Sequence, residues 1–136
     1  MTGFVLSSRS QNRLLDVHPD LKRVVRRAIK LSEIDFMVVE GRRTLKRQQE
    51  LVRAGASQTL NSRHLTGHAV DLAAVIGRRV RWDWPLYARL NQAMQQAAEE
   101  WAVAVEWGGA WTAFPDGPHW QLPWLAYPAA HSSSSP

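Results

Sequence analysis

The sequence predicts a single α+β domain, in which helices pack on one face of a small antiparallel sheet. Apolar residues recur along the chain with the 3.6-residue period of helices and with the two-residue period of strands. The two kinds of segment mix without the regular alternation that parallel βαβ folds require. At 136 residues the chain can bury a modest core. We expect residues 1–128 to form the domain and residues 129–136, which contain four serines, to be disordered.

Two helices are predicted in the first half of the chain. His18-Pro19-Asp20 predicts a helix start, because proline and an acidic residue are both favoured in a first turn. Thr44 is expected to cap a second helix that ends near Ala54, before Gly55. Residues 1–17 show no clear periodicity. The apolar residues of the first helix follow helical spacing: Leu21, Val24, Val25, Ala28, Ile29 and Leu31.

Two strands are predicted beside these helices, at Phe36–Val39 and at Ala69–Ala74. Side chains alternate along a strand, so Asp71 should share a face with Ala69 and Ala73, opposite Val70, Leu72 and Ala74. The apolar face would pack on helices. The two alanines would leave room for a ligand beside Asp71.

The second half of the chain supplies the longest predicted helix and the last strands. Residues 76–80 predict a turn into a short strand, and the helix runs from Trp84-Pro85 to about Trp101. Val103–Trp107 and His119–Leu122 would be the last strands, joined by a loop rich in glycine and proline.

On the last predicted strand, alternation places His119 and Gln121 on the face opposite Trp120 and Leu122. If this strand lies beside the one that carries Asp71, the two would bring His119 and Asp71 together.

Composition and charge exclude several classes of protein. No apolar run approaches the roughly 20 residues of a transmembrane helix, and residues 1–13 contain no apolar segment typical of a secretory signal. The net charge of +5 favours acidic partners, but Lys and Arg are spread along the chain rather than gathered in one stripe. We therefore expect a monomer made in the cytoplasm, without a transmembrane segment and without a nucleic acid partner.

Tryptophan is unusually frequent, at seven residues. Such rings fill hydrophobic cores and also line grooves that bind carbohydrate or peptide. Both roles stay open from the sequence, with a groove lined by at least two rings as one expectation. Five of the seven lie in the last third of the chain: Trp101, Trp107, Trp111, Trp120 and Trp124.

Two segments, Ser62–Asp71 and Asp116–His119, carry residues suited to metal-dependent chemistry. Together they offer two imidazoles and a carboxylate as ligands, and a second carboxylate that can activate water. Catalytic zinc is usually held by three nitrogen and oxygen ligands of this kind. The chain has no cysteine, which excludes a thiolate site.

His64 and His68 also have the i, i+4 spacing of a helical metal-binding pair. Gly67 and the strand pattern that follows argue against a helix there, and no glutamate follows His64 as in the HExxH motif. We expect His68 to lie at the rim of a site or beside one of its ligands.

The same segments resemble the zinc peptidases of the D-Ala-D-Ala carboxypeptidase and VanX/VanY family, and most closely the phage L-alanyl-D-glutamate endopeptidases, which are endolysins. The resemblance runs from about Ser10 to Leu122. It rests on four motifs in family order: Glu40-Gly41-Arg42-Arg43-Thr44, Ser62-x-His64-x-x-Gly67-x-Ala69-x-Asp71, Glu106-Trp107-Gly108-Gly109-x-Trp111 and Asp116-x-x-His119.

The resemblance implies that His64, Asp71 and His119 bind Zn²⁺, that Asp116 is the catalytic base and that Arg43 contacts the substrate or the transition state. It implies hydrolysis of the L-alanyl-D-glutamate bond in peptidoglycan peptide stems. An endolysin of this kind would accumulate in the host cytoplasm without a signal peptide. It would reach the periplasmic cell wall after the membrane is permeabilised.

Two other functions fit the same residues. A zinc D,D-carboxypeptidase or dipeptidase acting on D-Ala-D-Ala termini would use the same chemistry. A non-catalytic module that binds cell wall or nucleic acid would keep the fold without needing Asp116 and Arg43, so their presence favours an enzyme.

Overall fold

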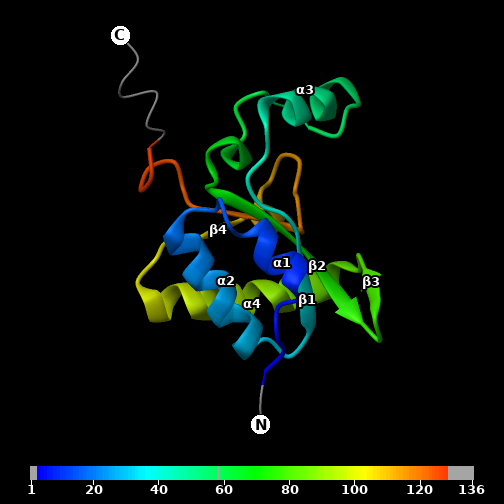
Figure 1. Ribbon diagram of the computed structural model, residues 1–136, viewed down its shortest axis with the longest axis vertical. Coiled ribbons are helices and arrows are strands. Elements are labelled where there is room, and N and C mark those ends of the chain that lie inside the picture. The colour runs from blue at the N-terminus through cyan, green and yellow to red at the C-terminus, as the bar shows by residue number, and fades with distance from the viewer. Residues whose placement is uncertain (1–2, 58, 129–136) are drawn as a thin grey trace.

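Strands from both halves of the chain form one antiparallel sheet in the computed structural model, which describes residues 3–57 and 59–128 (Figure 1). In this part of the chain the strand order is β1-β2-β5-β4, and β3 pairs with the last residues of β2. The expected disorder of residues 129–136 falls outside the described residues. The strands are β1 (Asp35–Glu40), β2 (Ala69–Ile76), β3 (Arg79–Arg81), β4 (Glu106–Trp107) and β5 (His119–Gln121).

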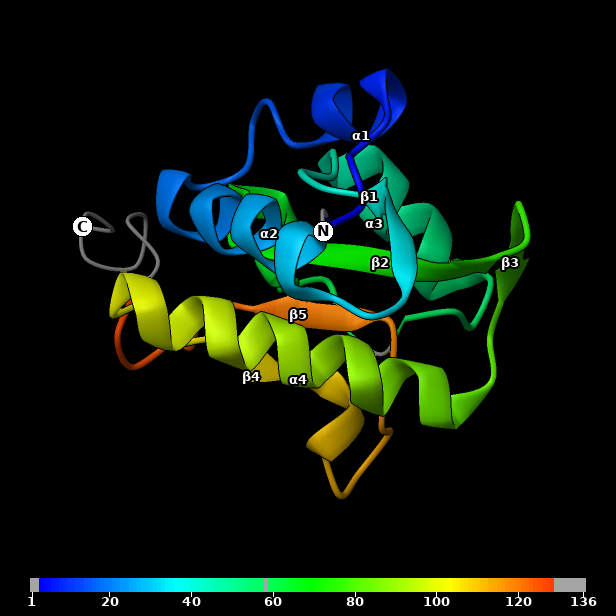
Figure 2. The same cartoon turned by 90° about the horizontal axis from the view of Figure 1, so that it is seen from below.

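Helices α2 (Pro19–Leu31) and α4 (Trp84–Trp101) lie side by side on one face of the sheet (Figure 2). The prediction of an α+β domain with helices on one face is thereby confirmed. Helix α3 (Leu45–Arg53) stands apart from both, at the opposite end of the molecule from α4 (Figure 1), and buries only Gln48. Among the described residues, no helix combines the length and the apolar character that crossing a membrane requires.

The apolar face of the sheet forms the core with α2 and α4, as the alternation of side chains predicts. Val70, Leu72 and Ala74 of β2 are fully buried, and so are Trp120 of β5 and Leu122 after it. The indole Nε1 of Trp120 donates to Asn91 Oδ1 of α4 at 3.0 Å. Because this face is occupied by the core, Asp71 and His119 lie on the other side of the sheet.

The predicted helix starts are also confirmed. His18 Nδ1 accepts a hydrogen bond from the Asp20 amide at 3.0 Å at the start of α2. Thr44 Oγ1 accepts one from the Arg47 amide at 3.1 Å at the start of α3. Both bonds satisfy amides that have no partner within their own helix.

Helix α1 (Ser8–Arg13) was not predicted, because polar interactions rather than an apolar stripe hold it in place. Ser7 caps it, and the buried Ser10 hydroxyl accepts from the Val38 amide at 2.9 Å. Arg13 Nη1 donates to the Val38 carbonyl at 2.9 Å. The helix thus covers the outer edge of β1, where the ladder to β2 is irregular.

Strand β4 is shorter than the predicted Val103–Trp107. Ala102 adopts a left-handed conformation with φ of 55°, and the Val103 amide donates back to the Ala98 carbonyl at 2.9 Å. These residues therefore end α4 and leave only Glu106 and Trp107 to pair with β5.

Gly67 combines a left-handed backbone conformation with a close backbone neighbour. Its φ is +76°, and an added Cβ would lie 2.3 Å from the Asp16 carbonyl oxygen. We expect Gly67→Ala to lower the free energy of unfolding by more than the roughly 1–2 kcal/mol of left-handed strain alone. Denaturant unfolding measures the difference, with Gly55→Ala as control, because Gly55 has φ of +77° and no described atom within 4 Å of an added Cβ. Equal losses in the two variants would contradict the close approach to Asp16.

Candidate active site

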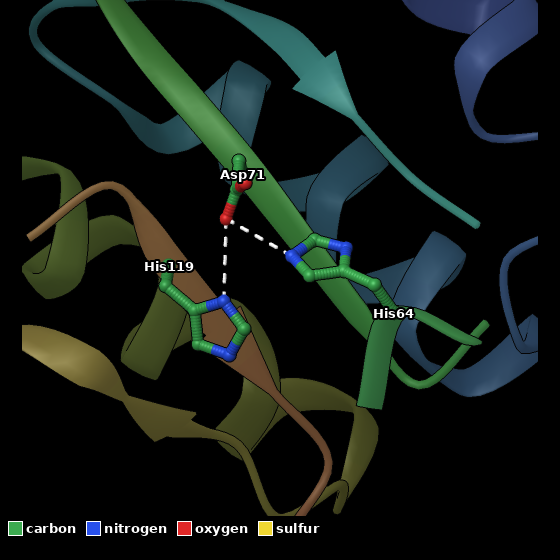
Figure 3. Close-up of side chains that lie close together, drawn as sticks. All are labelled: His64, Asp71 and His119. Atoms are coloured by element: carbon green, nitrogen blue, oxygen red, sulfur yellow. Dashed lines mark hydrogen bonds and ion pairs between the residues drawn. The ribbon is translucent and has the colours of Figure 1, made fainter. Parts of the chain in front are cut away.

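Three side chains from different segments converge on one point: His64, Asp71 and His119 (Figure 3). Asp71 and His119 are direct partners in the β2–β5 ladder. His64 comes from η1 (Arg63–Thr66), a 3₁₀ turn that ends at Gly67 just before β2. Asp71 Oδ1 lies 3.2 Å from His64 Nε2 and 3.2 Å from His119 Nδ1. One ligand atom from each of the three residues lies within 4.8 Å of the others, so the group can hold a metal ion.

The His64 ring is oriented by the backbone. Its Nδ1 lies 2.8 Å from the Gly41 carbonyl oxygen, which can only accept, so Nδ1 carries a proton. Nε2 is then the nitrogen that faces Asp71 and can bind a metal. A bond of this kind on the second ring nitrogen is the usual support of a metal-binding histidine.

Asp71 and its two histidine partners form a coupled electrostatic group. Burial alone would raise the pKa of Asp71, but hydrogen bonds and charges from His119 and His64 outweigh it and hold this pKa well below its usual range. Burial alone would lower the pKa of His119, but the hydrogen bond to Asp71 and its charge outweigh burial and raise it. Asp71 is therefore ionised at neutral pH, as a metal ligand must be.

Arg43 reaches the same group from the segment after β1. Its Nη2 donates to Glu40 Oε1 at 2.7 Å and to Asp71 Oδ2 at 3.4 Å, and its Nη1 donates to Gln48 Oε1 at 2.6 Å. The side chain is only 8% exposed. Arg42, in contrast, is exposed. Of the two adjacent arginines, the structure therefore brings Arg43 to the site.

Asp116 lies in the loop between β4 and β5. Its backbone amide donates to the Gly108 carbonyl at 2.8 Å, and its carbonyl accepts from the His119 amide at 3.2 Å. Although the residue as a whole is exposed, its carboxyl group is partly buried, and this burial, together with the negative charge of Asp71, raises its pKa. Asp116 thus presents a carboxyl group on the same side as the metal-binding group.

All five residues line one open cleft of about 830 Å³. Trp82, Trp111 and Trp124 also line it, so the expectation of a groove with at least two tryptophans is confirmed. The remaining tryptophans include core residues such as Trp120.

His68 is not among the residues that line this cleft, and its described side-chain neighbours do not include a metal-binding residue, so the expectation that it lies at the rim or beside a ligand was wrong. Its ring packs near His18 and Tyr127, with ring centroids 5.2 and 6.2 Å away, and its Nδ1 is 2.7 Å from Thr66 Oγ1. The turn at Gly67 separates it from His64, which confirms that the two do not form a helical pair.

Most of the partners that orient the site residues were not predicted from the sequence. Gln48, Glu40 and the Gly41 carbonyl hold Arg43 and His64, while Gln121 contacts His119. Only Gln121 gave a usable signal, since its place two residues after His119 puts both side chains on one face of the strand.

Comparison with known proteins gives consistent matches. The family model of the phage L-alanyl-D-glutamate peptidase matches residues 2–121. The L-alanyl-D-glutamate peptidase of Escherichia phage T5 is 32% identical over 118 residues, which cover 84% of this chain and 86% of that protein. The L-alanyl-D-glutamate peptidase of Listeria phage A118 is 34% identical over 130 residues, or 93% of this chain but 45% of that protein.

One solved structure is similar to this chain in both fold and sequence. The crystal structure of the Serratia marcescens L-Ala D-Glu endopeptidase ChiX matches with a TM-score of 0.87 and 51% identity. The match covers 92% of this chain and 95% of that one.

The contacts of Arg43 predict that lysine cannot replace it. One ammonium group cannot reach Glu40, Asp71 and Gln48 together, so Arg43→Lys should lower the free energy of unfolding by on the order of 2 kcal/mol. Arg42→Lys, at an exposed position, should stay within about 0.5 kcal/mol of the unaltered chain. Denaturant unfolding of both variants checks this, and losses of equal size would show that the contacts of Arg43 do not stabilise the site.

Proposed function

The chain belongs to the phage L-alanyl-D-glutamate peptidase family, and we propose that it hydrolyses the L-alanyl-D-glutamate bond of peptidoglycan peptide stems with a zinc ion held by His64, Asp71 and His119. The convergence of these three side chains in a tryptophan-lined cleft is the observation that carries the proposal. The catalytic domain would be residues 1–128, acting as a monomer.

The donor set fits zinc. Two imidazoles and one carboxylate are ligands typical of catalytic zinc, whereas magnesium and calcium prefer oxygen ligands alone. All three ligand atoms are close together, and the ring of His64 is already oriented by the Gly41 carbonyl. Zinc bound there would supply Lewis-acid chemistry, which polarises a carbonyl group and lowers the pKa of water.

Asp116 is the proposed general base. Its carboxylate would take a proton from the attacking water and pass the proton to the leaving amine, so that the amide bond breaks without release of a strongly basic group. Its support is its place in the cleft wall, three residues before His119.

Arg43 is the proposed contact for the substrate. It lines the cleft, and its planar guanidinium suits a carboxylate or a developing oxyanion. Because Glu40 and Gln48 hold its two terminal nitrogens, the group would meet the substrate in a fixed orientation.

The biological role would be the lysis of a host cell from within. The named relatives include the peptidases of two phages, which supports a role for this chain in phage lysis. The protein would accumulate in the host cytoplasm and reach the periplasmic wall after the membrane is permeabilised.

Digestion of purified muropeptides tests the bond that is cut. Mass spectrometry should show the stem peptide released between L-Ala and D-Glu, with the D-Ala termini intact. Loss of terminal D-Ala alone would assign the chain to the D,D-carboxypeptidase or dipeptidase alternative.

Metal analysis tests the ligand set. The purified chain should hold one zinc ion, and His64→Ala, Asp71→Ala and His119→Ala should each lose zinc and activity together, since each removes one of three ligands. His68→Ala is the control and should keep zinc, because His68 lies outside the cleft. Full zinc content in all three ligand variants would refute the site.

Replacement of Asp116 separates catalysis from metal binding. Asp116→Asn should keep zinc and the fold but lose on the order of 10²–10⁴ in rate, the usual contribution of general acid–base catalysis. Rates on muropeptides and zinc content are measured on the same preparation. Near-normal turnover of the zinc-loaded variant would point to another base, with Glu106, which lines the cleft near His119, as the next candidate.

A further inference from the structure

A chain of hydrogen bonds leads from His119 away from Asp71. His119 Nε2 lies 2.8 Å from Gln121 Oε1, and Gln121 Nε2 donates to Glu106 Oε1 at 2.7 Å. Gln121 and Glu106 are direct partners in the β4–β5 ladder, and Gln121 is only 6% exposed. The sheet itself therefore places the three side chains in line.

Only one order of donors and acceptors satisfies this chain. An ionised carboxylate accepts hydrogen bonds and cannot donate, so Gln121 must turn its NH₂ group toward Glu106. Its carbonyl oxygen then faces His119 and can only accept. The ring nitrogen that meets it, Nε2, must carry the proton.

The opposite arrangement is disfavoured by the same chemistry. If the Gln121 amide were turned over, its oxygen would lie against the Glu106 carboxylate, two acceptors at hydrogen-bond distance. His119 could then carry its proton on Nδ1, directed at Asp71 Oδ1, and that nitrogen would not be free to bind a metal. The negative charge of Glu106 favours the first form, and in the zinc-free chain it has to outweigh Asp71 Oδ1, which lies 3.2 Å from Nδ1 and accepts from a proton there.

We propose that Glu106 and Gln121 are positioning residues that keep the proton of the His119 ring on Nε2 and leave Nδ1 free to bind the metal. The inference rests on the proposal that His119 is a zinc ligand. The protonated nitrogen of the two histidine rings is therefore fixed in different ways. In His64 it is fixed by the Gly41 carbonyl of the backbone. In His119 it is fixed by the Gln121 side chain, which is itself oriented by the charge of Glu106.

Reciprocal substitutions test the pair. Glu106→Gln removes the charge that orients the amide, and Gln121→Glu sets two carboxylates against each other. Each should weaken zinc affinity about 10–100-fold, the usual effect of losing a partner of a metal ligand. The double variant E106Q/Q121E restores a donor at position 106 and an acceptor at position 121, and its affinity should recover to about that of the unaltered chain.

Chelator competition measures these affinities, and circular dichroism checks that each variant is folded. Glu99→Gln removes the same charge at an exposed position of α4 and should leave zinc affinity unchanged. Unaltered affinity in both single variants would overturn the proposal. So would a double variant no better than the weaker single one.

The tautomer itself can be read in the zinc-free chain by ¹⁵N NMR of the His119 ring, at a pH where the ring is neutral. The proton should be on Nε2 in the unaltered chain and should spread to Nδ1 in Glu106→Gln. A ring protonated on Nδ1 in the unaltered chain would overturn the proposal, even if a single variant fails to fold. The NMR measurement does not need bound zinc. A wrong assignment of Glu106 and Gln121 can therefore be distinguished from a wrong assignment of the zinc ligands.

Discussion

The antiparallel pairing of β2 with β5 is the constraint on which the site depends. It sets Asp71 directly opposite His119, while Val70 and Trp120 one residue away pair on the core side. A shift of β5 by one residue against β2 would turn His119 into the core and Trp120 toward the cleft, and His119 would no longer lie beside Asp71. The burial of Trp120 and its neighbours under α2 and α4 therefore holds the two ligands together.

Around that pairing, each site residue is oriented by a partner from a different segment. Arg43 donates to Glu40 and Gln48 and also reaches Asp71, so it links the end of β1 and helix α3 to the sheet. The Arg43 amide donates to the His64 carbonyl at 2.8 Å, which ties the same segment to η1. A site built in this way is preorganised, because the ligand side chains are held by the folded chain itself.

Features with a local signal could be predicted from the sequence, and those that depend on distant partners could not. Strand alternation placed Asp71 and His119 on one face, and the turn at Gly67 ruled out a helical pair of His64 and His68. Helix α1 was missed because its support comes from hydrogen bonds to Val38 of β1. The predicted position of His68 was wrong because the residues that pack near its ring, His18 and Tyr127, are far away in the sequence.

The proposed catalytic zinc ion would be held by one particular atom from each of His64, Asp71 and His119. Anomalous diffraction at the zinc absorption edge, from crystals of the purified protein, tests this assignment most directly. We expect one peak at about 2.0–2.2 Å from His64 Nε2, Asp71 Oδ1 and His119 Nδ1, the usual distances of zinc from nitrogen and oxygen ligands. A zinc peak away from the cleft, or a zinc ion bound by His119 through Nε2, would contradict this assignment of the ligand atoms.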